Sequence, residues 1–274
     1  MNYAELQAEY KLIDLYCAYL KDKGRAYHTI STRRSSLRFT AKSIGLNADP
    51  ETMRKWLFRK PLLPKSIVCG IADVRQFFTW AVENGYAEYN PTAGLKPPSL
   101  PHKTPKPIPE KELEYLLSKA NPKFKVWILL GAFAGLKCQE IAALDREDVL
   151  DDGWLHIASK QKERIVPMHP AIEKALADYG MPDTGPLFLR HDGSKAHAED
   201  VSQWLRKFME KVGVESTPTS LRHYFGAQTL RACHDVRVVQ ELMGHEYLGT
   251  TKMYERFDKQ AGKQAVASLS LAGI

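Results

Sequence analysis

The segment LMGHEYLGTTKMYERF, residues 242–257, places His245 nine positions before Tyr254. Gly244 ends the apolar helical pattern of the preceding residues, so we expect His245 just past the end of a helix. Tyr254 is either an ordinary buried aromatic residue, packed against Phe257 one turn on, or a nucleophile. This segment alone leaves both interpretations open.

The segment TPTSLRHYFG, residues 217–226, adds an arginine to the histidine and the tyrosine. Thr219 and Arg222 are three positions apart on a predicted helix and project from one face. Thr250 or Thr251 is expected to cap a further short helix that contains the tyrosine. Together these residue types suit attack on a phosphodiester, in which a tyrosine oxygen attacks and the arginine fork binds phosphate oxygens. An arginine that pairs with a surface acid and a histidine that caps a loop are the structural alternatives.

Composition predicts a globular protein of the cytosolic type. The chain has 274 residues, of which 44% are hydrophobic and 26% charged, and we expect two modest domains. The N-terminus lacks the basic leader of a secretory signal, and the longest apolar run, 126–136, is far short of the ~20 residues that span a bilayer. The cysteines are far apart and are expected to be reduced core thiols: Cys17, Cys69, Cys138 and Cys233.

The positive charge is concentrated near the N-terminus. Net charge is +7, and residues 1–96 carry 15 Lys and Arg against 9 Asp and Glu, whereas the rest of the chain carries 24 against 23. Such a distribution favours a polyanionic partner such as DNA, and a merely solvated basic face is the alternative.

Six prolines in KPPSLPHKTPKPIP, residues 96–109, exclude a persistent helix or central strand there and predict a linker. The domains expected are a helical DNA-binding domain at 1–96, a Pro-rich linker at 97–109, a catalytic domain at 110–258 and a tail at 259–274 that suits docking on a neighbouring subunit. Apolar spacing predicts N-terminal helices at 5–23, 29–44, 49–59 and 65–84.

After the linker, the pattern predicts a mixed domain. Two short β-rich runs, 154–158 and 164–168, surround a polar tip and predict a hairpin. Helices are expected at 110–120, 124–135, 170–179, 197–212 and 219–231, and from Asp235 to Gly244. The fold class predicted is mainly α with a small β-sheet.

These segments resemble the tyrosine recombinase, or phage integrase, family. Its signature combines an H-x-L-R-H helix, an L-G-H turn and a tyrosine nine residues after the histidine of that turn, similar to TSLRHYFG and LMGHEYLGTTKMY here. Upstream, GAFAGLKCQEIAALDREDV is similar to the G-L-R-x-x-E box, and ASKQKERIVPM to the G-K-x-x-K-E-R hairpin. The resemblance covers nearly the whole chain. It implies a helical core-binding domain and a mixed α+β catalytic domain that form a C-shaped DNA clamp.

The resemblance assigns roles to individual residues. Tyr254 matches the nucleophile, Arg222 the second catalytic arginine and His245 the histidine of the third box. The lysine that protonates the departing 5′ oxygen matches Lys160, with Lys162 as the alternative because the hairpin tip is one residue shorter than usual. Glu140 and His223 match residues that support the site; a helix-surface carboxylate and a core histidine are the structural alternatives.

Two positions depart from the family pattern. Lys137 stands where the family has its first arginine, and Thr219 where it has a histidine or lysine. Lysine keeps the charge but loses the bidentate fork, and threonine cannot act as an imidazole base.

The resemblance implies a site-specific DNA recombinase that forms a covalent 3′-phosphotyrosyl intermediate and exchanges strands through a four-way (Holliday) junction. It implies no metal or other cofactor, a homotetramer on two double-stranded core sites, and a location in the bacterial nucleoid, encoded by a phage or mobile element. An accessory directionality factor and the DNA target stay open. A weakened or inactive DNA-binding protein on the same scaffold is the alternative. The expected DNA-binding residues are Arg33, Arg34, Arg38, Lys65 and Arg75.

Overall fold

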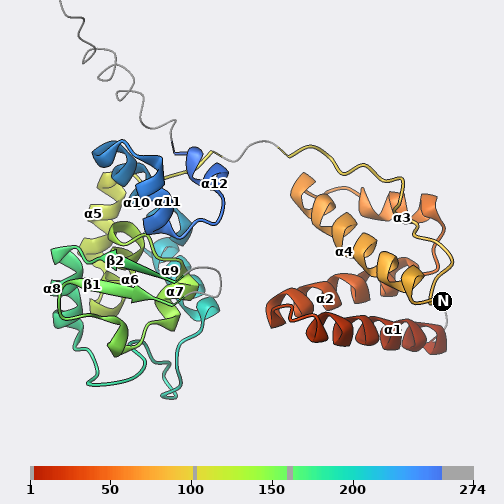
Figure 1. Cartoon of the computed structure of the whole chain (residues 1–274), viewed down its shortest axis with the longest axis horizontal. Coiled ribbons are helices and arrows are strands. Elements are labelled where there is room, and N and C mark those ends of the chain that lie inside the picture. The colour runs from red at the N-terminus through yellow and green to blue at the C-terminus, as the bar shows by residue number, and fades with distance from the viewer. Residues whose placement is uncertain (1–2, 101–103, 159–162, 255–274) are drawn as a thin grey trace, which may run out of the picture. The chain divides into compact units, whose positions relative to one another are not determined.

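The computed structural model describes residues 3–100, 104–158 and 163–254, and divides the chain into two compact units, 1–102 and 103–274 (Figure 1). Mainly helical architecture with one small sheet confirms the predicted fold class. Among the described residues, no helix is long and apolar enough to cross a membrane.

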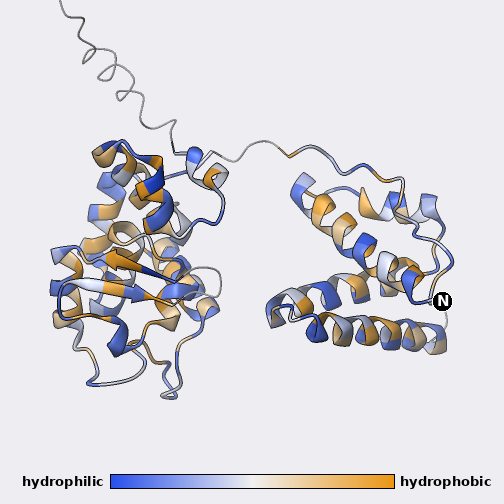
Figure 2. Cartoon of the chain, viewed as in Figure 1, coloured by the Kyte–Doolittle hydropathy of each residue, from blue (hydrophilic) through white to orange (hydrophobic). Residues whose placement is uncertain are grey.

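Four helices form the N-terminal unit: α1 (Tyr3–Asp22), α2 (Tyr27–Ile44), α3 (Pro50–Leu57) and α4 (Pro64–Glu83). Each helix begins and ends within a few residues of its predicted bounds. Apolar residues alternate with polar ones along α1 and α4 (Figure 2), as expected for helices that bury one face. The fully buried side chains of its core include Tyr16, Leu37, Met53, Ile71 and Phe77.

Helix α6 (Pro122–Phe133) is the centre of the C-terminal unit, and α8 (Pro170–Tyr179) and α10 (Pro218–Cys233) both pack against it. Its first turn is set by Pro122 and by the Asn121 side chain, which accepts a hydrogen bond from the Phe124 backbone. Residues 126–132 are all buried, which explains the continuous apolar run. The remaining elements before α10 are α5 (Glu110–Lys119), α7 (Cys138–Ala143), the short 3₁₀ helix η1 (Arg146–Asp148) and α9 (Ala198–Lys211).

The predicted hairpin is present as β1 (Trp154–Ile157) and β2 (Arg164–Pro167), paired antiparallel with Leu155 opposite Val166. Alternation places Leu155, Ile157 and Val166 in the core. The same alternation turns Arg164 inward, where its side chain is buried. Residues 159–162 at the hairpin tip, with Lys160 and Lys162, lie outside the described residues.

Helices α11 (Val236–Met243) and α12 (Leu248–Lys252) follow α10. Gly244 ends α11 in the left-handed conformation, with φ of 60°, and His245 follows it as predicted. The expectation for α12 was wrong in detail, because Tyr247 precedes it and Thr250 and Thr251 lie inside it. Tyr254 therefore lies two residues beyond the helix rather than within it.

The expectation of four core thiols was wrong for two of them. Cys17 is buried and Cys138 is half-buried, but Cys69 and Cys233 are exposed. Cys69 lies on an outward-facing position of α4, and Cys233 is the last residue of α10, where the chain turns at left-handed His234.

Candidate active site

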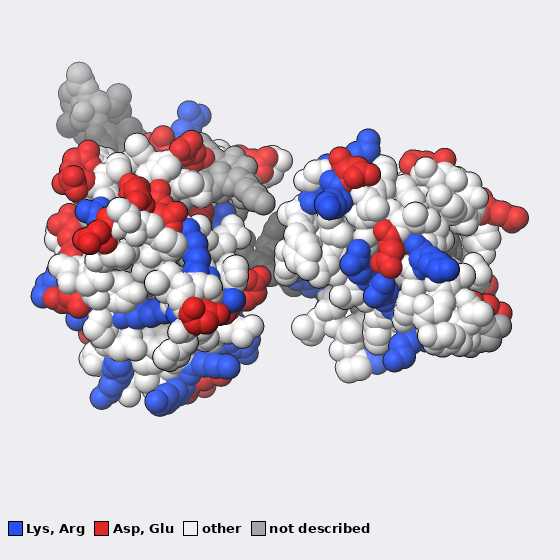
Figure 3. All heavy atoms as spheres, turned by 90° about the horizontal axis from the view of Figure 1, so that it is seen from below, with Lys and Arg blue, Asp and Glu red and all other residues white. Residues whose placement is uncertain are grey.

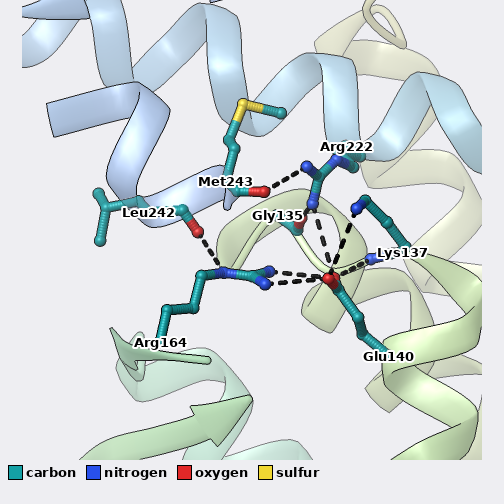
Figure 4. Close-up of polar contacts among 7 residues, drawn as sticks. All are labelled: Gly135, Lys137, Glu140, Arg164, Arg222, Leu242 and Met243. Atoms are coloured by element: carbon teal, nitrogen blue, oxygen red, sulfur yellow. Dashed lines mark hydrogen bonds and ion pairs between the residues drawn. The ribbon is translucent and has the colours of Figure 1, made fainter. Parts of the chain in front are cut away.

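The Glu140 carboxylate lies at the centre of a buried cluster of cations (Figure 4). It lies in the first turn of α7 and accepts a hydrogen bond of 2.8 Å from the backbone N–H of Lys137. Arg164 donates to both carboxylate oxygens, at 2.9 and 3.0 Å. The two side chains are only 2% and 3% exposed, so this is a fully buried, bidentate ion pair.

Burial raises the pKa of the Glu140 carboxyl, but the hydrogen bonds and charge of Arg164 outweigh burial and leave the pKa lowered. The carboxyl is therefore ionised at neutral pH. The alternative of a helix-surface carboxylate is wrong, because the first turn of α7 faces the interior at this position.

Arg164 also joins the hairpin to the end of α11. Its Nε donates to the Leu242 carbonyl at 2.8 Å, and its guanidinium packs over Gly244. A Cβ at Gly244 would lie 2.8 Å from Arg164 Nη1, so the glycine provides both the left-handed turn and the space.

Arg222 reaches the same carboxylate from α10. Its Nη1 lies 3.6 Å from Glu140 Oε2, and the guanidinium donates hydrogen bonds to the carbonyls of Gly135 and Met243. Burial lowers the pKa of Arg222 to about 10, which leaves the group charged at neutral pH. The arginine is thus held by three acceptors from three different segments.

Lys137 occupies a more open position beside this cluster. Its Nζ lies 3.8 Å from Glu140 Oε1, and its side chain is 30% exposed. Burial lowers the pKa of Lys137, and the charge of Glu140 opposes that shift. Lys137, Thr219 and Arg222 line one cleft of about 570 Å³, which is also lined by Ser202 and Gln203 of α9.

The phenol of Tyr254 is buried, with 1% of its surface exposed. Burial raises the pKa of Tyr254 to about 12. Its hydroxyl and His223 Nδ1 lie 2.8 Å apart in a hydrogen bond. Gly226 makes room for the ring, since a Cβ there would lie 2.7 Å from Tyr254 Cζ and 2.8 Å from Met243 Sδ.

His245 lies against the same phenol ring. The two rings are parallel, with centroids 6.5 Å apart, and His245 Nδ1 is hydrogen-bonded to Thr251 Oγ1 at 2.8 Å. Burial and the charges of Arg222, Lys137 and Arg164 lower the pKa of His245 to about 4. The imidazole is therefore neutral at physiological pH.

The fold thus assembles one site from distant segments. It brings together Lys137, Arg164 and Arg222 around the Glu140 carboxylate, and Tyr254 with His223 and His245. The sequence did not single out Arg164 as a site residue, and it predicted Thr251 as a possible helix cap rather than as the partner of His245. Two signals could have identified Arg164: the K-E-R residues of the hairpin motif, and the alternation of the β2 strand, which turns position 164 toward the core. No comparable signal marked Thr251 as a partner of His245.

The expected DNA-binding residues of the N-terminal unit differ in the partners that their side chains contact. Arg34 and Arg38 share Asp14, and Arg33 pairs with Asp73 at 3.5 Å. Lys65 is exposed at the start of α4.

Arg75 is the exception among those candidates. Its Nη2 donates to the backbone carbonyls of Thr92 and Leu95. These bonds hold the end of the unit to α4, so Arg75 is not among the residues that we propose to contact DNA.

A sequence model described as the phage integrase family matches residues 106–261, more than half of the chain. The chain belongs to that family. This confirms the resemblance found in the sequence, and the integrase is a tyrosine-type site-specific recombinase that acts on DNA.

Two relatives cover most of the integrase. Tyrosine recombinase XerC of Chromobacterium violaceum is 31% identical over 269 residues, covering 89% of each chain. Tyrosine recombinase XerC of Neisseria meningitidis is 27% identical over 280 residues, covering 89% of this chain and 90% of the relative.

Solved structures support the fold of both units. A lambda integrase dimer bound to a COC′ core site matches with a TM-score of 0.73 at 13% identity, covering 96% of this chain and 79% of that one. The Tn1549 transposon integrase in complex with transposon right end DNA matches with a TM-score of 0.71 at 18% identity, covering 94% and 99%.

Proposed function

We propose that the integrase cleaves and rejoins DNA at a specific core site, with Tyr254 as the nucleophile. The observation that carries this proposal is the placement of one phenol beside two imidazoles, next to buried Arg222 of α10. The Tyr254 oxygen would bond the scissile phosphorus, form a 3′-phosphotyrosyl link and release a 5′-hydroxyl.

The cations have distinct roles in this proposal. Arg222 and Lys137 bind nonbridging oxygens, and His245 adds a neutral hydrogen bond to the transition state. Glu140 and Arg164 hold these groups in place rather than touching the phosphate. Lys160, or Lys162 in its place, protonates the 5′ oxygen.

Substrate binding must rearrange the site. Tyr254 is buried, so the phosphate has to gain access to the phenol. Arg222 donates to two protein carbonyls and lines the cleft beside Lys137, and its guanidinium has further N–H donors for the phosphate. The loop and short helix between His245 and Tyr254 are the segment whose movement would expose the hydroxyl.

We further propose that residues 1–96 and 110–258 are the DNA-binding and catalytic domains of a clamp, joined by the linker 97–109. The two solved integrases named above are bound to DNA, and one is a dimer on a core site. Double-stranded core sites are therefore the proposed partner, with a homotetramer on two duplexes and a four-way junction. The tail 259–274, outside the described residues, is proposed to dock on a neighbour.

A second candidate is a binding protein with weak or no cleavage. Lys137 and Thr219 favour it, because one lacks the arginine fork and the other lacks an imidazole. Retention of Tyr254, Arg222 and His245 in one site favours the recombinase.

Because the target sequence is open, the test begins with a pool of randomised duplexes carrying a nick. The integrase is incubated with the pool, and DNA that stays attached in detergent is amplified and sequenced. We expect enrichment of one sequence by the unaltered protein and none by Tyr254→Phe, which should still bind the enriched duplex. Equal attachment by Tyr254→Phe, or DNA binding without attachment by the unaltered protein, would overturn the proposed reaction.

A further inference from the structure

The histidine nearest the nucleophilic oxygen is not the one in the third sequence box. His223 Nδ1 lies 2.8 Å from Tyr254 Oη, and the two rings are tilted by 57° with centroids 5.9 Å apart. The His245 ring is parallel to the phenol ring with the centroids 6.5 Å apart, and its own Nδ1 is hydrogen-bonded to Thr251. His223 therefore contacts the reacting atom, whereas His245 lies parallel to the phenol ring and is hydrogen-bonded to a threonine.

A buried tyrosine needs a proton acceptor more than an exposed tyrosine does, because burial disfavours the charged phenolate. With the pKa of Tyr254 raised to about 12 by burial, roughly one phenol in 10⁵ is ionised at neutral pH. The lowered pKa of His245, about 4, makes that imidazole a weak base. Attack by the phenol therefore requires another group that removes its proton.

Thr219 cannot supply that group. It lies one turn before His223 on α10, at the position that the family fills with histidine or lysine, and its hydroxyl is no base at neutral pH. The chain therefore lacks an imidazole or amine at position 219 but retains an imidazole one turn later, in contact with the phenol.

We propose that His223 is the general base that deprotonates Tyr254. The inference rests on the proposed function, since it requires that Tyr254 attacks a phosphodiester. It changes the expected part of His223 from a supporting residue to a catalytic one.

His223 exchanges one proton with Tyr254 during cleavage and rejoining. Neutral His223, protonated on Nε2, accepts the hydrogen bond of the phenol at Nδ1. As Oη bonds phosphorus, its proton moves to Nδ1 and the bond from phosphorus to the 5′ oxygen breaks. The 5′ oxygen takes a proton from the lysine of the hairpin tip. In the rejoining step a 5′-hydroxyl attacks phosphorus and returns its proton to the now neutral lysine. The bond from phosphorus to Oη breaks, and His223 returns its proton to Oη.

The experiment measures single-turnover attachment of DNA-bound protein to the duplex enriched by the unaltered integrase. His223→Asn keeps an acceptor near the Nδ1 position but cannot take a proton, and His223→Gln is the second variant. His191→Asn, an exposed histidine in the same unit, is the matched control. Each variant is tested on an ordinary duplex and on one with sulfur in place of the bridging 5′ oxygen, which leaves without protonation.

We expect both His223 variants to bind the duplex and to attach about 10²-fold more slowly or worse on both substrates. Imidazole added to His223→Gly should restore part of the rate. Restoration by the sulfur substrate alone would make His223 part of leaving-group protonation and overturn the proposal. An unchanged or faster rate would also overturn it, because the bond would then only hold Tyr254 at rest. Failure of the unaltered protein to attach would instead count against the proposed function.

Discussion

Two arginines share one carboxylate in each unit of the integrase. The cluster in the catalytic unit is buried, and the cluster in the N-terminal unit is exposed. In the catalytic unit, Arg164 and Arg222 meet at Glu140, and the three side chains are at most 9% exposed. In the N-terminal unit, Arg34 and Arg38 meet at Asp14, and the three side chains are 40–46% exposed.

The difference in exposure distinguishes buried cations that hold the active site together from exposed cations that can bind DNA phosphates. Removing one member of a buried cluster leaves uncompensated charge in a medium that solvates it poorly, whereas exposed partners regain water. Consistent with this, Figure 3 shows Lys and Arg atoms of the N-terminal unit on either side of an acidic patch at the surface.

The largest expected effect comes from neutralising the two shared carboxylates. Glu140→Gln leaves Arg164 and Arg222 buried without their anion and should destabilise the catalytic unit by about 3–5 kcal/mol. Asp14→Asn, the matched change, should cost under about 1 kcal/mol. Hydrogen exchange of peptides from each unit measures the loss of stability in both variants. Similar losses in the two variants would remove the distinction between the clusters.

A smaller effect is expected on the chemical step at Lys137, the most open cation of the buried cluster. Lys137→Arg should raise the rate of covalent attachment by roughly tenfold or more, because a guanidinium holds two phosphate oxygens in a plane. Ground-state DNA binding should change little, and Thr219→His should give a smaller gain. Single-turnover cleavage by each variant and the pair provides the measurement. An unchanged or lower rate in Lys137→Arg would place Lys137 away from the scissile phosphate.

Exposed cations should affect binding rather than chemistry. Arg34→Ala and Lys65→Ala should each weaken duplex binding and reduce the salt dependence by about one released counterion. Arg75→Ala is the contrasting variant, because that guanidinium holds backbone carbonyls and its loss should lower stability. Binding titrations over a salt series would contradict the assignment if Arg34 and Lys65 left the slope unchanged.

The smallest effect concerns pH. Because the pKa of His245 is lowered to about 4 in the folded chain, the unfolded chain binds the proton more readily between about pH 6.5 and 4. Stability from this group is present above pH 6.5 and is lost as pH falls through that window. His245→Gln should lose less stability than the unaltered protein between pH 7 and pH 5, as thermal unfolding would show. An identical loss would mean that His245 is solvated.

Much of this fold follows from local sequence. The hairpin and the stop at Gly244 have local causes and were predicted. The Asn121-Pro122 start of α6 also has a local cause, but the prediction began this helix at residue 124. The start of α12 was not predicted, because neither threonine in TTKMY caps the helix and Tyr247 is the N-cap residue.

The site was predictable only in part. Spacing and family resemblance singled out Tyr254, Arg222 and His245. Arg222 lies within α10, and the other two residues lie just past helix ends. Their partners depend on tertiary packing: the buried pair between Glu140 and Arg164 joins residues 24 positions apart, and Arg222 contacts a carbonyl 87 positions away. Similarly, the salt bridges of Arg34 and Arg38 are set by the packing of α1 against α2.

The central claim is that Tyr254 is the nucleophile of a site assembled by this buried cluster. Digestion of the covalent adduct, followed by mass spectrometry of the peptide that carries the nucleotide, tests it most directly. The account predicts that the modified residue is Tyr254, with none of the other tyrosines among the 12 in the chain carrying DNA. A nucleotide on any other residue would contradict it.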